Sequence, residues 1–93
     1  MKITVLEKAK NKLRIEIEGE GHTFCNLLQH ILLEDKTVEM AGYNIPHPLV
    51  GKPILHVKTR EGRSPEEVLL KALERIGELS GEFLKEFEKA TQS

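Results

Sequence analysis

The segment Lys12–Leu32, KLRIEIEGEGHTFCNLLQHIL, contains the change of hydrophobic period that decides the fold of this chain. From Lys12 to Glu18 apolar and charged residues alternate, which predicts a strand with one buried face. Beyond Gly21 the apolar residues recur at helical spacing and span an arc of about 140° on a helix. The members of that arc are Phe24, Leu27, Leu28, Ile31 and Leu32. We therefore expect a strand followed by a helix that Thr23 caps and that ends near Lys36.

Three further segments have the patterns of strands. Residues 2–18 predict a hairpin, because a first alternating segment precedes the strand above and only residues 9–11 separate the two. Residues 38–45 contain β-forming side chains and predict a third strand, which stops at a proline. Residues 54–60 alternate again and predict a fourth strand. The intervening residues 46–53 include three prolines and predict a rigid irregular loop.

The strongest local signal is Ser64-Pro65-Glu66-Glu67, which has the features of a helix start. Ser64 is suited to cap the helix, Pro65 suits its first position, and Glu67 lies three residues after the cap. The apolar residues that follow span an arc of about 160°. They are Val68, Leu69, Ala72, Leu73, Ile76, Leu79, Phe83, Leu84 and Phe87. The pattern predicts a single helix to about Lys89, which would be about 38 Å long at 1.5 Å per residue.

The order of these elements is ββαββα within a single domain of residues 1–93. This order predicts an α+β fold with a four-stranded antiparallel sheet and two helices on one face, because the strands leave charged residues on the other face. Both apolar arcs are wider than the stripe of about 100° that a helix needs to face a sheet. The two helices could cover each other, but the length of the second favours a partner protein.

Composition excludes several classes of function. The chain has 14 basic and 15 acidic residues, so it lacks the positive charge that favours direct nucleic-acid binding. No apolar run approaches the roughly 20 residues of a membrane span, and the start has no signal-peptide core. Cys25 is the sole cysteine, which agrees with a reducing compartment. We expect a cytoplasmic protein with no membrane or nucleic-acid partner of its own.

Three segments, in this order, carry a resemblance to a known family. They are HTFCNLL at residues 22–28, AGYNIPHPL at 41–49 and TREGRSPEEVLLKAL at 59–73. Together they resemble the small assembly subunits, subunit L, of archaeal DNA-directed RNA polymerases. That family is similar to the smaller assembly subunits of eukaryotic polymerases and to the dimerisation domain of the bacterial alpha subunit. The family pattern differs at two positions, with a glycine where Cys25 stands and a basic residue where Gln29 stands.

The resemblance implies a non-catalytic subunit of a nucleotidyltransferase complex that acts in transcription. It would form a heterodimer by helix packing with the larger assembly subunit of the polymerase, which is designated D. The large catalytic subunits and other small subunits would assemble on that pair. The resemblance implies no cofactor and no metal. The predicted partner interface consists of Phe24, Leu27, Leu28, Ile31, Leu32, Leu69, Leu73, Ile76 and Phe83.

Chemical alternatives rest on weaker signals. His22 and Cys25 have a local spacing suitable for zinc, but a zinc site needs four converging ligands. Cys25 near a helix start could be an activated nucleophile, although no third orienting group is evident. The Pro46-His47-Pro48 element is similar to those of pterin dehydratases, so a homodimeric enzyme of that kind, or a ligand-binding module, is the alternative function.

Overall fold

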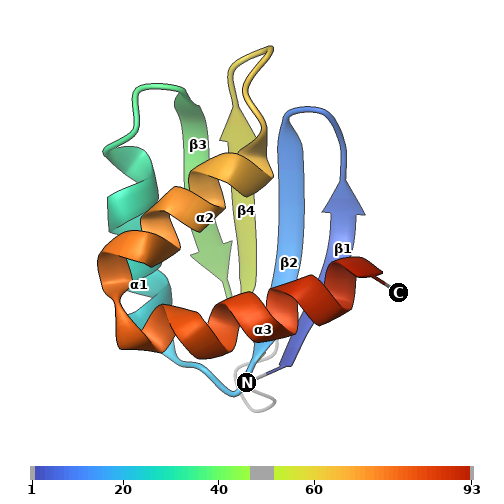
Figure 1. Cartoon of the computed structure of the whole chain (residues 1–93), viewed down its shortest axis with the longest axis vertical. Coiled ribbons are helices and arrows are strands. Elements are labelled where there is room, and N and C mark those ends of the chain that lie inside the picture. The colour runs from blue at the N-terminus through green and yellow to red at the C-terminus, as the bar shows by residue number, and fades with distance from the viewer. Residues whose placement is uncertain (1, 47–51, 93) are drawn as a thin grey trace.

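The alternating segments form a four-stranded antiparallel sheet in the computed structural model, which describes residues 2–46 and 52–92 (Figure 1). The order of the strands across the sheet is β1-β2-β4-β3. Their bounds are Lys2–Lys8 for β1, Lys12–Glu18 for β2, Val38–Asn44 for β3 and Ile54–Thr59 for β4. The predicted α+β class and the antiparallel sheet are therefore confirmed. Most of the predicted rigid loop, residues 47–51 with His47 among them, lies outside the described residues.

The hairpin β1–β2 has the predicted turn, where the Ala9 amide donates to the Lys12 carbonyl at 2.9 Å. The register shifts between Val5 and Glu7, so that Leu6 has no partner in the ladder. Such a bulge bends an edge strand and makes it a poorer template for a further strand.

One face of the sheet forms the core. Leu13, Ile15 and Ile17 of β2 are buried, as are Leu55 and Val57 of β4. Their neighbours along each strand point to the other face, where most of them are charged or polar. The alternation read from the sequence is thus the alternation between core and surface.

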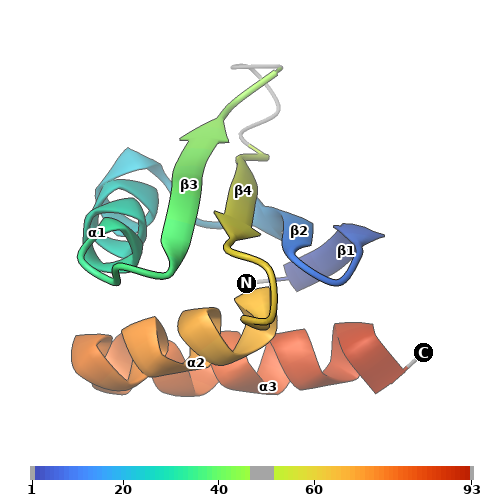
Figure 2. The same cartoon turned by 90° about the horizontal axis from the view of Figure 1, so that it is seen from above.

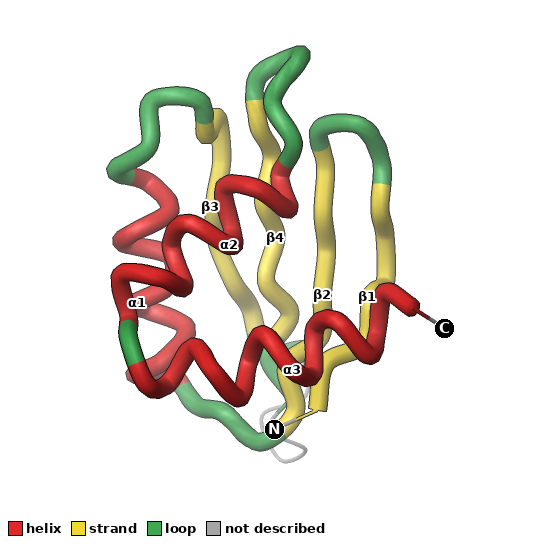
Figure 3. The backbone as a smooth tube through the Cα atoms, in the orientation of Figure 1, coloured by secondary structure: helices red, strands yellow, loops and turns green. Residues whose placement is uncertain are grey.

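Three helices cover the core, and they are α1 (His22–Leu33), α2 (Pro65–Ile76) and α3 (Glu78–Gln92). Figure 2 shows α2 and α3 in a layer on one side of the sheet, with α1 beside β3. The tube in Figure 3 shows how α3 runs across the sheet toward β1. Contacts join α1 to β3 and α2, and α3 to α2 and β1.

The sequence prediction for α1 was wrong at both ends. The helix begins at His22 with Gly21 as its N-cap residue, so Thr23 lies within the first turn and does not cap it. It ends at Leu33, because the Asp35 side chain accepts hydrogen bonds from both the Thr37 amide and hydroxyl and so stabilises a turn. By contrast, the cap at the start of α2 is confirmed, since Ser64 Oγ accepts a hydrogen bond from the Glu67 amide at 3.5 Å.

The prediction of a single helix from Ser64 to Lys89 was also wrong. The helix is broken at Gly77, whose φ of 82° lies in the region that favours glycine. The break changes the direction of the chain, so that α2 packs over β2 and β4 while α3 packs over β1. Phe83 and Phe87 are consequently buried in the core of the chain itself.

Candidate functional site

The nine residues of the predicted partner interface divide into two groups in the structure. Six are buried in the core of the isolated chain, namely Phe24, Leu28, Leu32, Leu69, Leu73 and Phe83. The other three reach the surface, since Leu27 is 42% exposed and Ile31 and Ile76 are half-buried. Leu27 and Ile31 are one helical turn apart and share one side of α1. Periodicity could not make this division, because it depends on how the helices pack.

Ile31 lies at a groove between α1 and α2 with a volume of about 190 Å³. Leu32, Val68 and Ala72 supply the rest of its apolar lining, and Asp35, Lys71 and Arg75 supply polar groups. An apolar floor with a charged rim is typical of the surfaces that take a partner's side chains.

An ion pair joins the end of α1 to α2 at the rim of this groove, with Arg75 Nη1 2.5 Å from Glu34 Oε2. The hydrogen bond from Arg75, and then its charge, hold the pKa of the Glu34 carboxyl below its usual range. The pair thus links the two helices that border the groove. The sequence alone does not reveal this pair, because the two residues are 41 positions apart and only the fold brings them together.

Aromatic contacts position α1 against the rest of the chain. His22 Nδ1 and the Tyr43 hydroxyl are 2.8 Å apart, which joins the start of α1 to β3. Phe24 stacks on Phe83 of α3 with ring centroids 5.7 Å apart, and Phe83 in turn stacks on Phe87. These contacts on the buried side of α1 fix the position of the helix, and therefore also the position of its exposed side.

Cys25 is fully buried in α1. Burial raises the pKa of its thiol to about 11, and the nearby Glu20 carboxylate adds to the rise. The thiol is therefore protonated at neutral pH, the reverse of what an activated nucleophile requires. His22, the residue paired with it in the zinc hypothesis, is bonded to Tyr43 instead. Within residues 2–46 and 52–92, no three side chains of histidine, cysteine, aspartate or glutamate are grouped to hold a metal ion.

We expect the Cys25 thiol of the native chain to react at least a hundred-fold more slowly with a thiol reagent at pH 7.5 than the same thiol in denaturant, because a buried, protonated thiol is a poor nucleophile. We expect Cys25→Ala to lose about 1–2 kcal/mol of stability, because it leaves a small cavity, and to leave partner affinity within a few-fold of the parent. Reaction rates and urea unfolding measure the two effects. Rapid modification of the native chain would show that Cys25 is an accessible, functional thiol.

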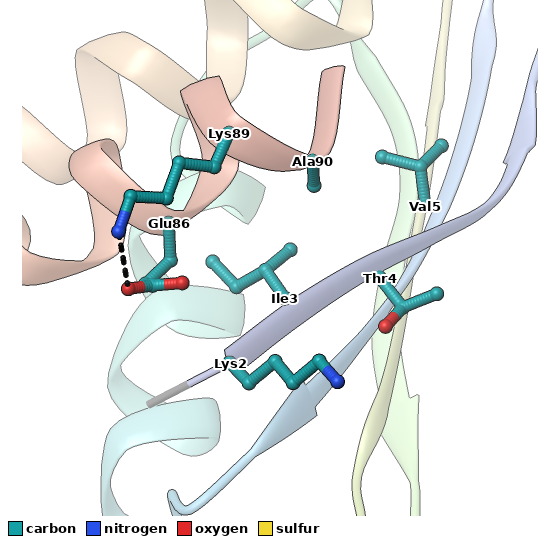
Figure 4. Close-up of a pocket in the computed structure, with 7 residues that line it drawn as sticks. All are labelled: Lys2, Ile3, Thr4, Val5, Glu86, Lys89 and Ala90. Atoms are coloured by element: carbon teal, nitrogen blue, oxygen red, sulfur yellow. Dashed lines mark ion pairs between the residues drawn. The ribbon is translucent and has the colours of Figure 1, made fainter. Parts of the chain in front are cut away.

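Another hollow, of about 420 Å³, lies between β1 and α3 (Figure 4). The side chain of Ile3 points toward the helix there, and Val5 and Ala90 add apolar surface. The charged groups of α3 at this hollow, Glu86 and Lys89, pair with each other at 3.7 Å. This is an incompletely covered sheet edge, without a converging acid and base such as general acid–base catalysis uses.

The length and hydropathy of the helices show whether any of them could span a membrane. Among the described helices, none combines the length and the apolar character needed to cross a bilayer.

Comparisons with known proteins show the family to which the chain is similar. A family model described as the RNA polymerase Rpb3/Rpb11 dimerisation domain matches residues 12–86. Over 76 residues the chain is 46% identical to "DNA-directed RNA polymerase subunit Rpo11" of Archaeoglobus fulgidus, covering 82% of this chain and 87% of that protein. Over 92 residues it is 45% identical to the protein of the same name from Methanothrix thermoacetophila, covering 99% of this chain and 100% of that one.

A solved structure is similar throughout. The crystal structure of DNA-directed RNA polymerase subunit L from Thermoplasma acidophilum has a TM-score of 0.71 and 27% sequence identity to this chain. The similarity covers 97% of this chain and 88% of that one. Because the family model matches residues 12–86 and a relative 45% identical is covered over 100% of its length, the chain belongs to the RNA polymerase Rpb3/Rpb11 dimerisation-domain family.

Proposed function

We propose that this chain is a non-catalytic assembly subunit of a DNA-directed RNA polymerase and that it forms a heterodimer with the larger assembly subunit of that enzyme, designated D. The observation that carries the proposal is the match of a dimerisation-domain model to residues 12–86, which include all of α1 and α2. The heterodimer would be the platform on which the large catalytic subunits and other small subunits assemble, in the cytoplasm, with the whole chain acting as one domain.

The surface of α1 and α2 supports this choice of interface. Ile31 lines the groove and is half-buried. Leu27 lies one helical turn before Ile31 on α1, and Ile76 lies one turn after Ala72 of the groove on α2. These partly exposed apolar side chains would contact the partner directly. Burying a leucine side chain contributes roughly 1.5–3 kcal/mol, so a few such contacts suffice to hold a pair of subunits. The six buried members of the predicted interface would contribute indirectly. Their packing in the core would fix the relative orientation of α1 and α2, and so the shape of the surface that the partner binds.

Residue 29 would not contribute an ion pair to this interface. Gln29 is half-buried on α1, at a position where the family resemblance implies a basic residue. Apolar contact would therefore account for more of the affinity here than in relatives with a charge at this position.

Isolation of the chain from the organism that encodes it tests the proposal. An affinity-tagged copy expressed at its natural level should co-purify with two polymerase subunits of large mass, as well as with the larger assembly subunit, in mass spectrometry of the eluate. A tagged Leu27→Glu variant should lose all of these together. Recovery of the chain as a homodimer, without large subunits, would overturn the proposal and favour the ligand-binding alternative.

A further inference from the structure

Figure 2 shows that α2 and α3 cover one side of the sheet. The strand pairing places three cations and an imidazole on the other face, here called the basic sheet patch and defined as Lys12, Arg14, His56 and Lys58. In the pairing of β2 with β4, Lys12 lies opposite Lys58 and Arg14 lies opposite His56. Residues two apart on a strand, or opposite one another on neighbouring strands, share a face. The four side chains therefore project together from the centre of the sheet.

Like charges in this arrangement repel each other within the isolated chain. Opposite residues in an antiparallel pair have Cα atoms only about 4.5–5.5 Å apart, and two lysines at that spacing destabilise the sheet. Lys58 has Glu39 as an ion-pair partner at 3.8 Å. Lys12 and Arg14 have no ion-pair partner within 4 Å among the described residues, although Glu7 lies across the ladder from Arg14. The patch thus keeps two exposed cations whose charge is not neutralised at contact distance.

The patch also has a shape that can receive a ligand. Its four side chains border a hollow of about 140 Å³, together with Glu7 and Met40. Met40 is 50% exposed and places a hydrophobic contact beside the cations. Gly42 of β3 lies opposite His56 of β4. A Cβ atom built at Gly42 would have no atom within 4 Å other than those of its chain neighbours, so the space beside this glycine is open.

We propose that the basic sheet patch docks an extended acidic segment of a partner protein, at a second interface separate from the helices. Lys12 and Arg14 are two residues apart, so their side chains repeat at about 7 Å along β2. Carboxylates at alternate positions of an extended segment repeat at the same distance and would lie over both cations. An apolar side chain of the segment would contact Met40. This interface goes beyond the proposed heterodimer and lets the chain hold partners on both of its sides.

The carboxylates around the patch favour a protein over a nucleic acid as the occupant. Glu7 lies on one side of the patch, on β1, and Glu39 lies on the other, on β3. A strand of nucleic acid carries phosphate charge along its whole length and would pass these carboxylates. A protein segment can place neutral or basic residues there and keep its acidic residues over the cations.

Fluorescence anisotropy with a labelled peptide tests the proposal on the full-length chain. The probe is an extended peptide of about nine residues with glutamate at alternate positions and threonine or leucine between them. The control peptide has glutamine in place of each glutamate. At about 50 mM salt we expect the acidic peptide to bind at least ten-fold more tightly than the control, and the difference to shrink as salt rises.

Two matched double variants show where the peptide binds. Lys12→Gln with Arg14→Gln should weaken binding of the acidic peptide at least ten-fold. Lys36→Gln with Lys85→Gln removes the same charge from exposed positions, one after α1 and one on α3, and should change it less than two-fold. The patch variant should unfold within a few degrees of the parent, because the loss of Lys12 removes its repulsion from Lys58 while the loss of Arg14 removes its attraction to Glu7 across the ladder. It should still pair with the larger assembly subunit.

Three results would overturn the proposal. The first is equal binding of the acidic and glutamine peptides, and the second is an equal loss of binding in both double variants. The third is an oligothymidylate that binds more tightly than the acidic peptide and loses affinity only in the patch variant, which would identify a nucleic-acid surface.

Discussion

Leu28→Glu is expected to unfold the isolated chain. Leu28 is fully buried, on the side of α1 that faces the core. The substitution removes roughly 1.5–3 kcal/mol of apolar burial and forces a carboxylate into the core at a cost of several kcal/mol more. Domains of this size are stable by only about 5–15 kcal/mol, so the sum consumes most or all of the stability. Circular dichroism at about 25 °C should show loss of the helical signal.

Leu28→Met is the matched control. It keeps the volume and apolar character of the side chain and should cost less than about 1.5 kcal/mol. If Leu28→Glu retained its helical signal and a cooperative thermal transition, the packing of α1 against the sheet would be wrong. Loss of partner affinity in this variant carries no information on the interface, because the fold itself is lost.

Leu27→Glu is expected to leave the fold intact and to weaken heterodimer formation by at least two orders of magnitude. Leu27 is 42% exposed, so a carboxylate at this position can remain in water in the isolated chain. In the heterodimer it would be buried against the partner, and a cost of about 2.8 kcal/mol already corresponds to a hundred-fold loss of affinity. Titration calorimetry against the larger assembly subunit measures the affinity, and circular dichroism checks the fold.

Leu33→Glu controls for the general effect of an added charge on α1. Leu33 is 50% exposed and lies about 120° around the helix from Leu27. Its substitution should change the affinity for the larger assembly subunit by less than five-fold. Normal binding by Leu27→Glu, or an equal loss in both variants, would place the partner elsewhere than on this side of α1.

The strands could be predicted from the sequence because each has one wet face. Charged residues at every second position of β2 are compatible with one register only, since a shift by one residue would bury them. The start of α2 was equally readable, because Ser64, Pro65 and Glu67 each satisfy a requirement of the first helical turn.

The break at Gly77 could not be predicted, because the apolar period continues on both sides of it. A glycine costs a helix only about 1 kcal/mol, so pattern alone favours a continuous helix. The width of the sheet determines whether the helix continues or breaks at Gly77. Phe83 and Phe87 become buried only when α3 turns away from the axis of α2 to cover β1, and that gain depends on contacts between distant segments.

The sequence identified the helices of the candidate interface but did not separate their core residues from their surface residues. The apolar arcs of both helices contain residues that border the groove, yet they include core residues such as Leu28 together with surface residues such as Leu27. A helix that packs between a sheet and a partner has one wide apolar arc. The spacing of the residues within that arc does not show which of them face the core and which face the partner. The pair Glu34–Arg75, which marks the rim of the groove, has no local signature at all.

The mass of the product formed with the larger assembly subunit tests whether this chain acts by heterodimerisation. The two purified proteins are mixed at equal molarity, and the mixture is analysed by size-exclusion chromatography with light scattering. We predict a single species with the mass of one copy of each protein, and we expect the Leu27→Glu variant to elute separately from its partner. Two separate peaks for the parent chain, or a peak with the mass of its homodimer alone, would contradict heterodimer formation.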